Sequence, residues 1–87
     1  MAQRNSVQPN GAYVRFISRY RGETDYGVTL PGHREEYRVT RNEAGEYPRA
    51  EVRDTPDAAI ASVNLFLAAE EREYQEWRKQ HPDLFPA

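Results

Sequence analysis

Hydrophobic and polar residues alternate along residues 12–20, the pattern of a half-buried β-strand. Tyr, Val, Phe and Ile, which favour strands, fill most of this stretch. Alternation sorts the side chains onto two faces. We expect the first face to pack on the rest of the protein; it carries Val14, Phe16, Ser18 and Tyr20. We expect the second face to meet solvent or a partner; it carries Tyr13, Arg15, Ile17, Arg19 and Arg21.

Three more strands are predicted after the first, separated by turn residues. Residues 26–30 end at the dipeptide Pro31-Gly32, which is typical of a tight turn. Residues 35–41 and 46–53 follow, joined by a hairpin loop over residues 42–45. Pro48 has no backbone N–H to donate, so the last strand is expected at an edge or a bulge of the sheet. Residues 1–11 are polar and without a period, and we expect a flexible N-terminal arm there.

A long helix is predicted over residues 56–80, with three start signals in register. Thr55 is suited to capping the free N–H groups, and Pro56 fits the first helical position. Asp57 adds negative charge at the positive end of the helix dipole. A stripe of apolar residues with helical spacing follows and is expected to pack on the sheet: Ile60, Val63, Leu67 and Tyr74, with Ala59 and Phe66 on its shoulder.

The expected fold class is α+β: a small antiparallel β-meander of three to four strands packed against one long C-terminal α-helix, within a single domain over residues 12–87. The predicted helix is about 37 Å long at 1.5 Å per residue. A domain of this size has a radius of gyration of about 12 Å. The last turns of the helix are therefore expected to overhang the sheet.

Composition narrows the class of protein. The chain has 87 residues, is 38% hydrophobic and carries a net charge of −2, which favours a folded chain over a disordered one. It contains no cysteine, as suits a reducing compartment. No apolar run approaches the roughly 20 residues of a membrane span, and residues 1–12 lack the apolar core of a signal peptide. We therefore expect a soluble, cytoplasmic protein that does not bind membranes.

Catalytic chemistry is poorly supported by the sequence. The two histidines, His33 and His81, lie beside a turn and at a helix end, where they are commonly surface residues. None of the nucleotide-binding or metalloprotease motifs occurs. The adjacent residues Glu35 and Glu36 point to opposite faces of a strand, so they do not form an acid–base pair. We expect no catalytic residue, no metal and no cofactor.

Binding to another protein, self-association included, is the function that the sequence favours. Trp, Tyr and Arg dominate interface hot spots, and both the second face of the first strand and the charged end of the helix carry them. The expected partner-binding residues are Tyr13, Arg15, Ile17, Arg19, Tyr74, Trp77, Arg78 and Phe85. Whether Trp77 and Phe85 belong to an interface or to a small satellite core stays open. Many small proteins without a motif are regulators or phage-encoded inhibitors, such as anti-CRISPR proteins.

Nucleic-acid binding is the alternative. Arg15, Arg19, Arg21 and Arg38, interleaved with Tyr13, are expected on the open face of the sheet. In outline this resembles the small sheets of the arm-binding domains of phage integrases, a likeness of architecture alone. The isoelectric point near 5.7 and the acidic helix argue against it, because phosphate binding normally needs a basic domain.

Overall fold

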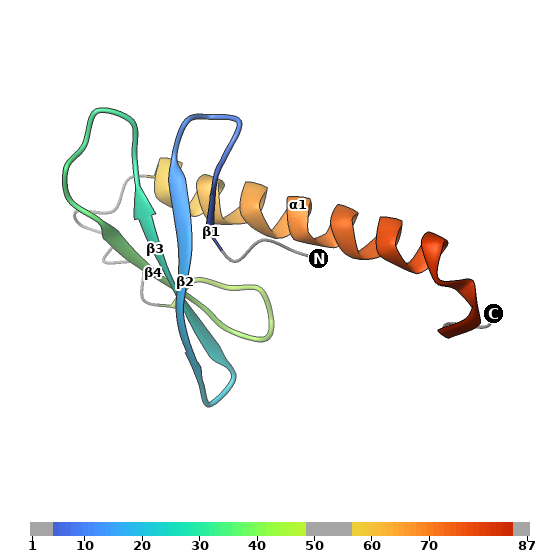
Figure 1. The fold of residues 1–87 in the computed structure, drawn as a ribbon. Helices are drawn as coiled ribbons and strands as arrows, with labels where there is room; N and C mark the ends of the chain where they lie inside the picture. The colour runs from blue at the N-terminus through green and yellow to red at the C-terminus, as the bar shows by residue number, and fades with distance from the viewer. Residues whose placement is uncertain (1–4, 49–56, 85–87) are drawn as a thin grey trace.

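The computed structural model describes residues 5–48 and 57–84, which form one sheet and one long helix (Figure 1). The strands are β1 (Asn5–Val7), β2 (Tyr13–Tyr20), β3 (Glu23–Thr29) and β4 (Tyr37–Arg41). They follow one another in space in chain order, and each pairs antiparallel with the next. Helix α1 (Asp57–Gln80) packs against this meander, and a short 3₁₀ helix, η1 (Pro82–Leu84), follows it. The predicted α+β fold is confirmed.

The first strand lies within the segment predicted to be a flexible arm. In β1, Ser6 pairs with Val14, and Val7 pairs with Tyr13. The loop to β2 is closed by a hydrogen bond from the Gln8 N–H to the Ala12 carbonyl at 2.7 Å. Gly11, with φ of 87°, provides the left-handed conformation that this tight turn requires. Asn5–Val7 is too short and polar to show a strand pattern, and its pairing with β2 gives it that structure.

The turn between β2 and β3 is tighter than the sequence pattern suggested. Arg21 and Gly22 both have positive φ, at 50° and 77°, as in the type I′ turn of two-residue hairpins. Because this turn takes only two residues, β3 already begins at Glu23, three residues before the predicted start.

The predicted fourth strand, residues 46–53, is not found in its described part. The loop after β4 closes instead through the Asn42 N–H, which donates to the Glu46 carbonyl at 2.9 Å, and residues 46–48 are not in a strand. Residues 49–53 lie outside the described part of the chain. The predicted caps Thr55 and Pro56 lie outside it too. The helix itself begins at Asp57, one residue from the predicted start.

Strand β2 contains a β-bulge that divides its arginines between the two faces of the sheet. Phe16 pairs with Tyr26, but Ser18 pairs with Asp25, so Ile17 is one residue too many. Before the bulge Arg15 stands opposite Gly27, and after it Arg19 stands opposite Thr24. Gly27 and Thr24 are three residues apart, so they lie on opposite faces of β3. The prediction that Arg15 and Arg19 share one face is therefore wrong.

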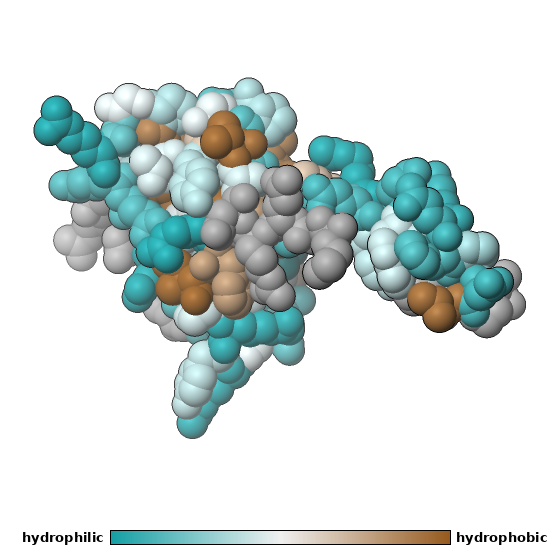
Figure 2. Space-filling model, viewed as in Figure 1, coloured by the Kyte–Doolittle hydropathy of each residue, from teal (hydrophilic) through white to brown (hydrophobic). Residues whose placement is uncertain are grey.

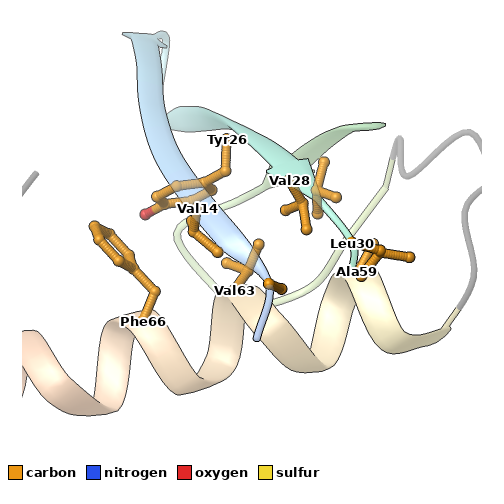
Figure 3. Close-up of a cluster of buried hydrophobic side chains, with 9 residues drawn as sticks. Val14, Tyr26, Val28, Leu30, Ala59, Val63 and Phe66 are labelled. Atoms are coloured by element: carbon orange, nitrogen blue, oxygen red, sulfur yellow. The ribbon is translucent and has the colours of Figure 1, made fainter. Parts of the chain in front are cut away.

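The core lies between the sheet and the first three turns of α1 (Figure 3). Val14, Val28 and Val39 reach it from three neighbouring strands, and Val63 and Phe66 reach it from the helix. The Phe66 ring meets the Tyr26 ring edge to face, with centroids 5.9 Å apart. Such a pair adds roughly 0.5–1.5 kcal/mol to the burial of the two rings.

The face of α1 that meets the sheet is rotated by about one residue from the predicted stripe. Its buried residues are Ala59, Ser62, Val63 and Phe66, whereas Ile60 and Leu67 are only partly buried at the margin. Ser62 fits in the core because its hydroxyl donates to the Ala58 carbonyl at 2.6 Å and accepts from the Asn10 amide at 2.9 Å. A polar residue therefore occupies a position that the hydrophobic pattern had excluded.

Candidate interaction surfaces

The open face of the sheet, the side away from α1, is centred on an ion pair between Arg15 and Glu36. The Arg15 guanidinium donates two hydrogen bonds to the Glu36 carboxylate, one of them 2.8 Å long. Glu36 lies over Gly27, where a side chain on Gly27 would collide with its carboxylate. The hydrogen bond from Arg15 is the main cause that lowers the pKa of Glu36, and the nearby charge of Arg38 acts in the same direction. The charge of Arg15 is thus largely compensated within the protein.

One apolar patch lies at the β1 edge of this open face. Tyr13 and Val7 are cross-strand neighbours and therefore lie on the same face. Tyr13 is exposed, and Val7 is 68% exposed. The structure supports Tyr13 as a surface residue, and it adds Val7, which sequence reasoning missed because β1 was not expected.

The other two predicted residues of β2 are not part of that surface. Ile17 is the bulge residue and is partly buried. Arg19 lies on the opposite face from Arg15, and its guanidinium is 4.0 Å from the Glu43 carboxylate, with both side chains largely exposed. An ion pair at this exposure contributes little to stability. Tyr13, Arg15, Ile17 and Arg19 therefore do not form one contiguous site.

The tip of the β2–β3 hairpin presents an aromatic and a basic side chain together. Tyr20 is 67% exposed, and the Arg21 guanidinium lies 5.2 Å from the centre of its ring. This distance is within the range of cation–π contacts. Simple alternation assigns Tyr20 and Arg21 to opposite faces, and the turn brings them together instead. The signal that could have located this tip is the dipeptide Arg21-Gly22 between two strand-forming segments.

The second half of α1 extends past the sheet and is surrounded by solvent along much of its length (Figure 1). The molecule measures 47 × 29 × 17 Å, and its radius of gyration of 14.4 Å exceeds the roughly 12 Å of a compact domain of this size. Within the described helix, every buried residue lies at or before Phe66. The expected overhang is therefore present, and its surface is mainly hydrophilic, with a small hydrophobic spot near the end (Figure 2).

The predicted residues of the helix end come together on this overhang. Trp77 follows Phe66 by 11 residues, which is three helical turns, so it continues the face that packs on the sheet. Tyr74 lies on the same side and is 44% exposed. The Arg78 guanidinium lies 6.0 Å from the centre of the Tyr74 ring. Phe85, the fourth predicted residue, lies outside the described residues.

Trp77 is partly covered by the residues that end the helix. The His81 ring stacks on the Trp77 ring, with centroids 4.3 Å apart and planes 23° from parallel. The Nδ1 atom of His81 is 2.9 Å from the Trp77 carbonyl oxygen, so the imidazole is held in place over the indole. Trp77 is not among the buried core residues. This ring contact is local to the end of the helix and does not involve the sheet.

A groove runs between β1 and α1 where the helix leaves the sheet. Ser6, Val7 and Pro9 line one wall, and Phe66, Ala69 and Glu73 line the other. It is partly open to solvent. No sequence pattern indicates this groove, because one wall is the strand that was not predicted.

The residues that the structure describes show no feature of a metal site or of a membrane span. In residues 5–48 and 57–84, no three His, Asp or Glu side chains gather into a possible metal site. No helix in this part of the chain combines the length and the apolar character needed to cross a membrane. Comparisons with family models, with curated proteins and with solved structures give no match, so the surfaces described above carry the functional argument alone.

Proposed function

We propose that this chain is a non-enzymatic protein-binding module that contacts its partner through the overhanging face of α1. The position of Trp77 is the observation that carries the proposal. It stands three turns beyond Phe66 on the same helix face, where the sheet no longer covers that face. An aromatic side chain at such a position is suited to a partner that replaces the sheet.

The neighbouring side chains have the composition of an interface hot spot. Tyr74 and Arg78 flank Trp77 on the overhang, and Tyr, Trp and Arg are the residues enriched among such hot spots. Acidic residues surround them, which provides the polar rim that interface centres usually have. The partner surface is expected to be apolar at its centre and to offer basic groups at its edge.

We place this activity in the cytoplasm, in agreement with the absence of cysteine. Occupying a surface of another protein is a mode of action of small regulators and phage-encoded inhibitors. Steric occlusion is the form of activity that we propose. The alternative, nucleic-acid binding by the open face, receives less support, because Arg15 is paired with Glu36 and Arg19 lies on the other face.

The test uses Trp77→Ala and a matched control, Leu65→Ala, which removes an exposed apolar side chain elsewhere on α1. Both tagged variants and the wild type are used to capture partners from extracts of the native host. We expect Trp77→Ala to keep nearly the wild-type melting temperature and to lose partner affinity by more than about 1–2 kcal/mol. Leu65→Ala should bind normally. A Trp77→Ala protein that is unfolded, or that binds as the wild type does, would contradict the proposal.

A further inference from the structure

The outer side of β1 carries backbone groups to which a further strand can bond. In the described part of the chain β1 is at the edge of the sheet, with β2 on one side only. The Gln8 N–H donates to the Ala12 carbonyl at 2.7 Å, and these two residues continue the register of β1 with β2. Opposite residues of an antiparallel pair alternate between bonded and non-bonded. Ser6 is therefore bonded to β2, whereas the N–H and C=O groups of Asn5 and Val7 point away from it.

Helix α1 extends beyond β1, so a strand added beside β1 would lie against the helix as the sheet itself does (Figure 1). The groove between β1 and α1 reaches along the helix to Glu73. From Glu73 to Gln80 the helix rises about 10 Å, and neighbouring strands are about 4.8 Å apart. The overhang is thus long enough for about two more strands beyond the edge of the sheet.

The two sides of β1 would meet different residues of an added strand. Ser6 pairs with Val14, which is in the core, so Ser6 lies on the side of α1. The residue of the added strand opposite Ser6 would therefore enter the groove. Val7 pairs with Tyr13 on the open face and is 68% exposed. The residue opposite Val7 would extend this apolar patch, for which β-branched and aromatic side chains are suited.

The groove combines apolar surface with an excess of negative charge. Phe66 and Ala69 provide the apolar part of the helix wall. The charged groups of that wall are the carboxylates of Glu70 and Glu73 and the guanidinium of Arg72, so the wall is net negative. A lysine side chain suits such a groove, because its methylene stem packs on apolar surface while its ammonium group extends toward the carboxylates.

We propose that a partner segment in extended conformation pairs antiparallel with β1 as an additional strand. The segment carries a basic residue opposite Ser6, and β-branched or aromatic residues on both sides of it. Antiparallel pairing continues the pattern of the existing sheet. The proposal rests on the proposed function, because it names the form in which the partner meets the overhang. The rest of the partner then covers Tyr74 and Trp77 further along α1.

The contact made by the segment alone is small. The outer side of β1 offers only the backbone groups of Asn5 and Val7, and the groove admits one side chain. Interfaces below about 1,200 Å² in total are typical of weak, transient complexes. We therefore expect an isolated segment to bind with a dissociation constant of about 0.1–1 mM. The whole partner binds more tightly, because it also contacts Trp77.

The probe is the peptide acetyl-Thr-Val-Lys-Val-Thr-amide, titrated to about 2 mM into nitrogen-15-labelled protein and followed by nuclear magnetic resonance. We expect saturable shifts of the amide signals of Val7, Ala69 and Glu73. Hydrogen exchange of the Val7 N–H should slow when the peptide is bound, because that group gains an acceptor. The Ser6 N–H, which is already bonded to β2, should change less.

Two methylated peptides test whether the backbone of the peptide bonds to β1. With the lysine opposite Ser6, both valine N–H groups point to β1 and the lysine N–H points away. Methylation of the two valine nitrogens should weaken binding about tenfold or more, and methylation of the lysine nitrogen should leave it within about twofold. The two changes are of the same kind, so a general effect of methylation would weaken both peptides.

Charge is tested on both molecules. A peptide with glutamate in place of lysine should bind about tenfold more weakly. Glu73→Lys in the protein should weaken the lysine peptide by a similar factor. Glu71→Lys is the matched control, because Glu71 is about 200° around the helix from Glu73 and does not line the groove. It should leave the affinity within about twofold.

The edge of β1 is tested by Val7→Pro. The Val7 N–H points away from β2, so proline removes a donor to the partner and no hydrogen bond between β1 and β2. The peptide should bind about tenfold more weakly to this variant. Val7→Thr keeps the N–H and the branched shape and should bind within about twofold of the wild type. An unchanged Ser6 amide signal checks that β1 is still paired, and the methylated peptides test the same bonds on the unaltered protein.

Several results would overturn the proposal. A Val7 amide that does not shift at about 2 mM peptide excludes the pairing. Equal binding of the valine-methylated peptide, or of the wild type and Val7→Pro, shows that the backbone of β1 is not used. A loss on methylation of the lysine nitrogen alone indicates parallel pairing and contradicts the proposed direction.

The proposed function is judged separately, by capture of the native partner. A partner that is lost on Trp77→Ala but kept on Val7→Pro supports the proposed function and rules out strand pairing. A peptide that binds at β1, together with a captured partner that is unaffected by Trp77→Ala, contradicts the proposed function and leaves β1 as the contact.

Discussion

The Glu36 carboxylate occupies the space in which a side chain of Gly27 would stand. Gly27 is in the middle of β3, between Arg15 on β2 and Arg38 on β4, and its φ is not in the left-handed region. The backbone would therefore accept other residues there. Glycine is required by the ion pair that lies over it and not by the strand itself.

Gly27→Ala should displace Glu36 and break its hydrogen bonds with Arg15. The pKa of Glu36 is lowered in the native protein, so we expect it to rise toward its ordinary value of about 4.5. Nuclear magnetic resonance titration of the carboxyl carbon measures this change. Arg15→Gln, which removes the donor without filling the space, should raise the pKa in the same direction. An unchanged Glu36 pKa in both variants would show that the ion pair is absent in solution.

The ion pair between Arg15 and Glu36 also predicts how the stability of the protein changes at acidic pH. Because the folded pKa of Glu36 is depressed, its stabilising contribution is present above about pH 4.5 and is lost as the pH falls through the folded value. Denaturant midpoints between about pH 3 and pH 6 should therefore fall less steeply in Arg15→Gln than in the wild type.

The loss of stability at alkaline pH depends on two tyrosines, Tyr26, which is buried, and Tyr47, which is partly buried. Burial is the main cause that raises the pKa of Tyr26 and of Tyr47. A raised folded pKa gives stability that is present below about pH 10 and is lost as the pH rises through the folded value. The double variant Tyr26→Phe/Tyr47→Phe should lose stability less steeply between about pH 9 and pH 11. Equal slopes in variant and wild type would show that the pKa values of Tyr26 and Tyr47 are not raised in the folded protein.

The hairpin tip contains a conformation that arginine adopts only at a cost. Arg21 has φ of 50°, in the left-handed region that favours Asn and Gly. Arg21→Asn should stabilise the domain by about 0.5–1 kcal/mol, whereas the β-branched Arg21→Val should destabilise it. Chemical denaturation of the three proteins measures the order. A less stable Asn variant would show that the contact of Arg21 with Tyr20 outweighs the backbone strain.

The rotated face of α1 predicts different costs for two neighbouring positions. Phe66 is buried against Tyr26, and Phe66→Ala should reduce the free energy of unfolding by about 3–5 kcal/mol. Leu67 lies at the margin, so Leu67→Ala should cost only about 1–2 kcal/mol, less than a fully buried leucine would. Denaturation midpoints compare the two directly. If Leu67→Ala cost more than Phe66→Ala, the buried face of α1 would instead be the one predicted from the sequence, with Leu67 at its centre.

The separation of Arg15 from Arg19 makes a prediction about nucleic acids. The net charge is −2, and the arginines do not form one continuous basic face. At about 150 mM salt we expect no complex with duplex DNA or RNA tighter than micromolar. Fluorescence anisotropy over a salt series measures this. A nanomolar complex that weakens steeply between about 50 and 200 mM salt, and is lost in Arg15→Glu/Arg19→Glu, would revive the alternative function.

The sequence predicted the fold because its strongest local signals agree with the tertiary structure. Alternation over residues 12–20 produced β2, and the long uninterrupted stretch without Gly or Pro produced α1. It could not predict β1, whose three residues become a strand only by pairing with β2. Nor could it locate the bulge at Ile17, because the bulge moves the residues that follow it to the other face, and this shift is set by the pairing with β3.

The candidate site was predicted only in part, for the same kind of reason. Tyr74, Trp77 and Arg78 do come together, because residues three and four apart on a helix share one side. The proposed set on β2 was divided by the bulge, which depends on pairing with another strand. Ser62 is a further example, because its place in the core depends on Asn10, 52 residues away.

The overhang has a consequence for the dynamics of α1. An isolated helix of about 12–15 residues is marginal in water, so the turns beyond the sheet depend on their own propensity and on η1 for their order. Amide hydrogen exchange should therefore be slow near Val63, within the core, and should quicken toward Gln80. A partner on this face would slow exchange in the last turns. The exchange rates of the amides in the last turns of α1 thus show, residue by residue, whether a partner is bound to the overhang.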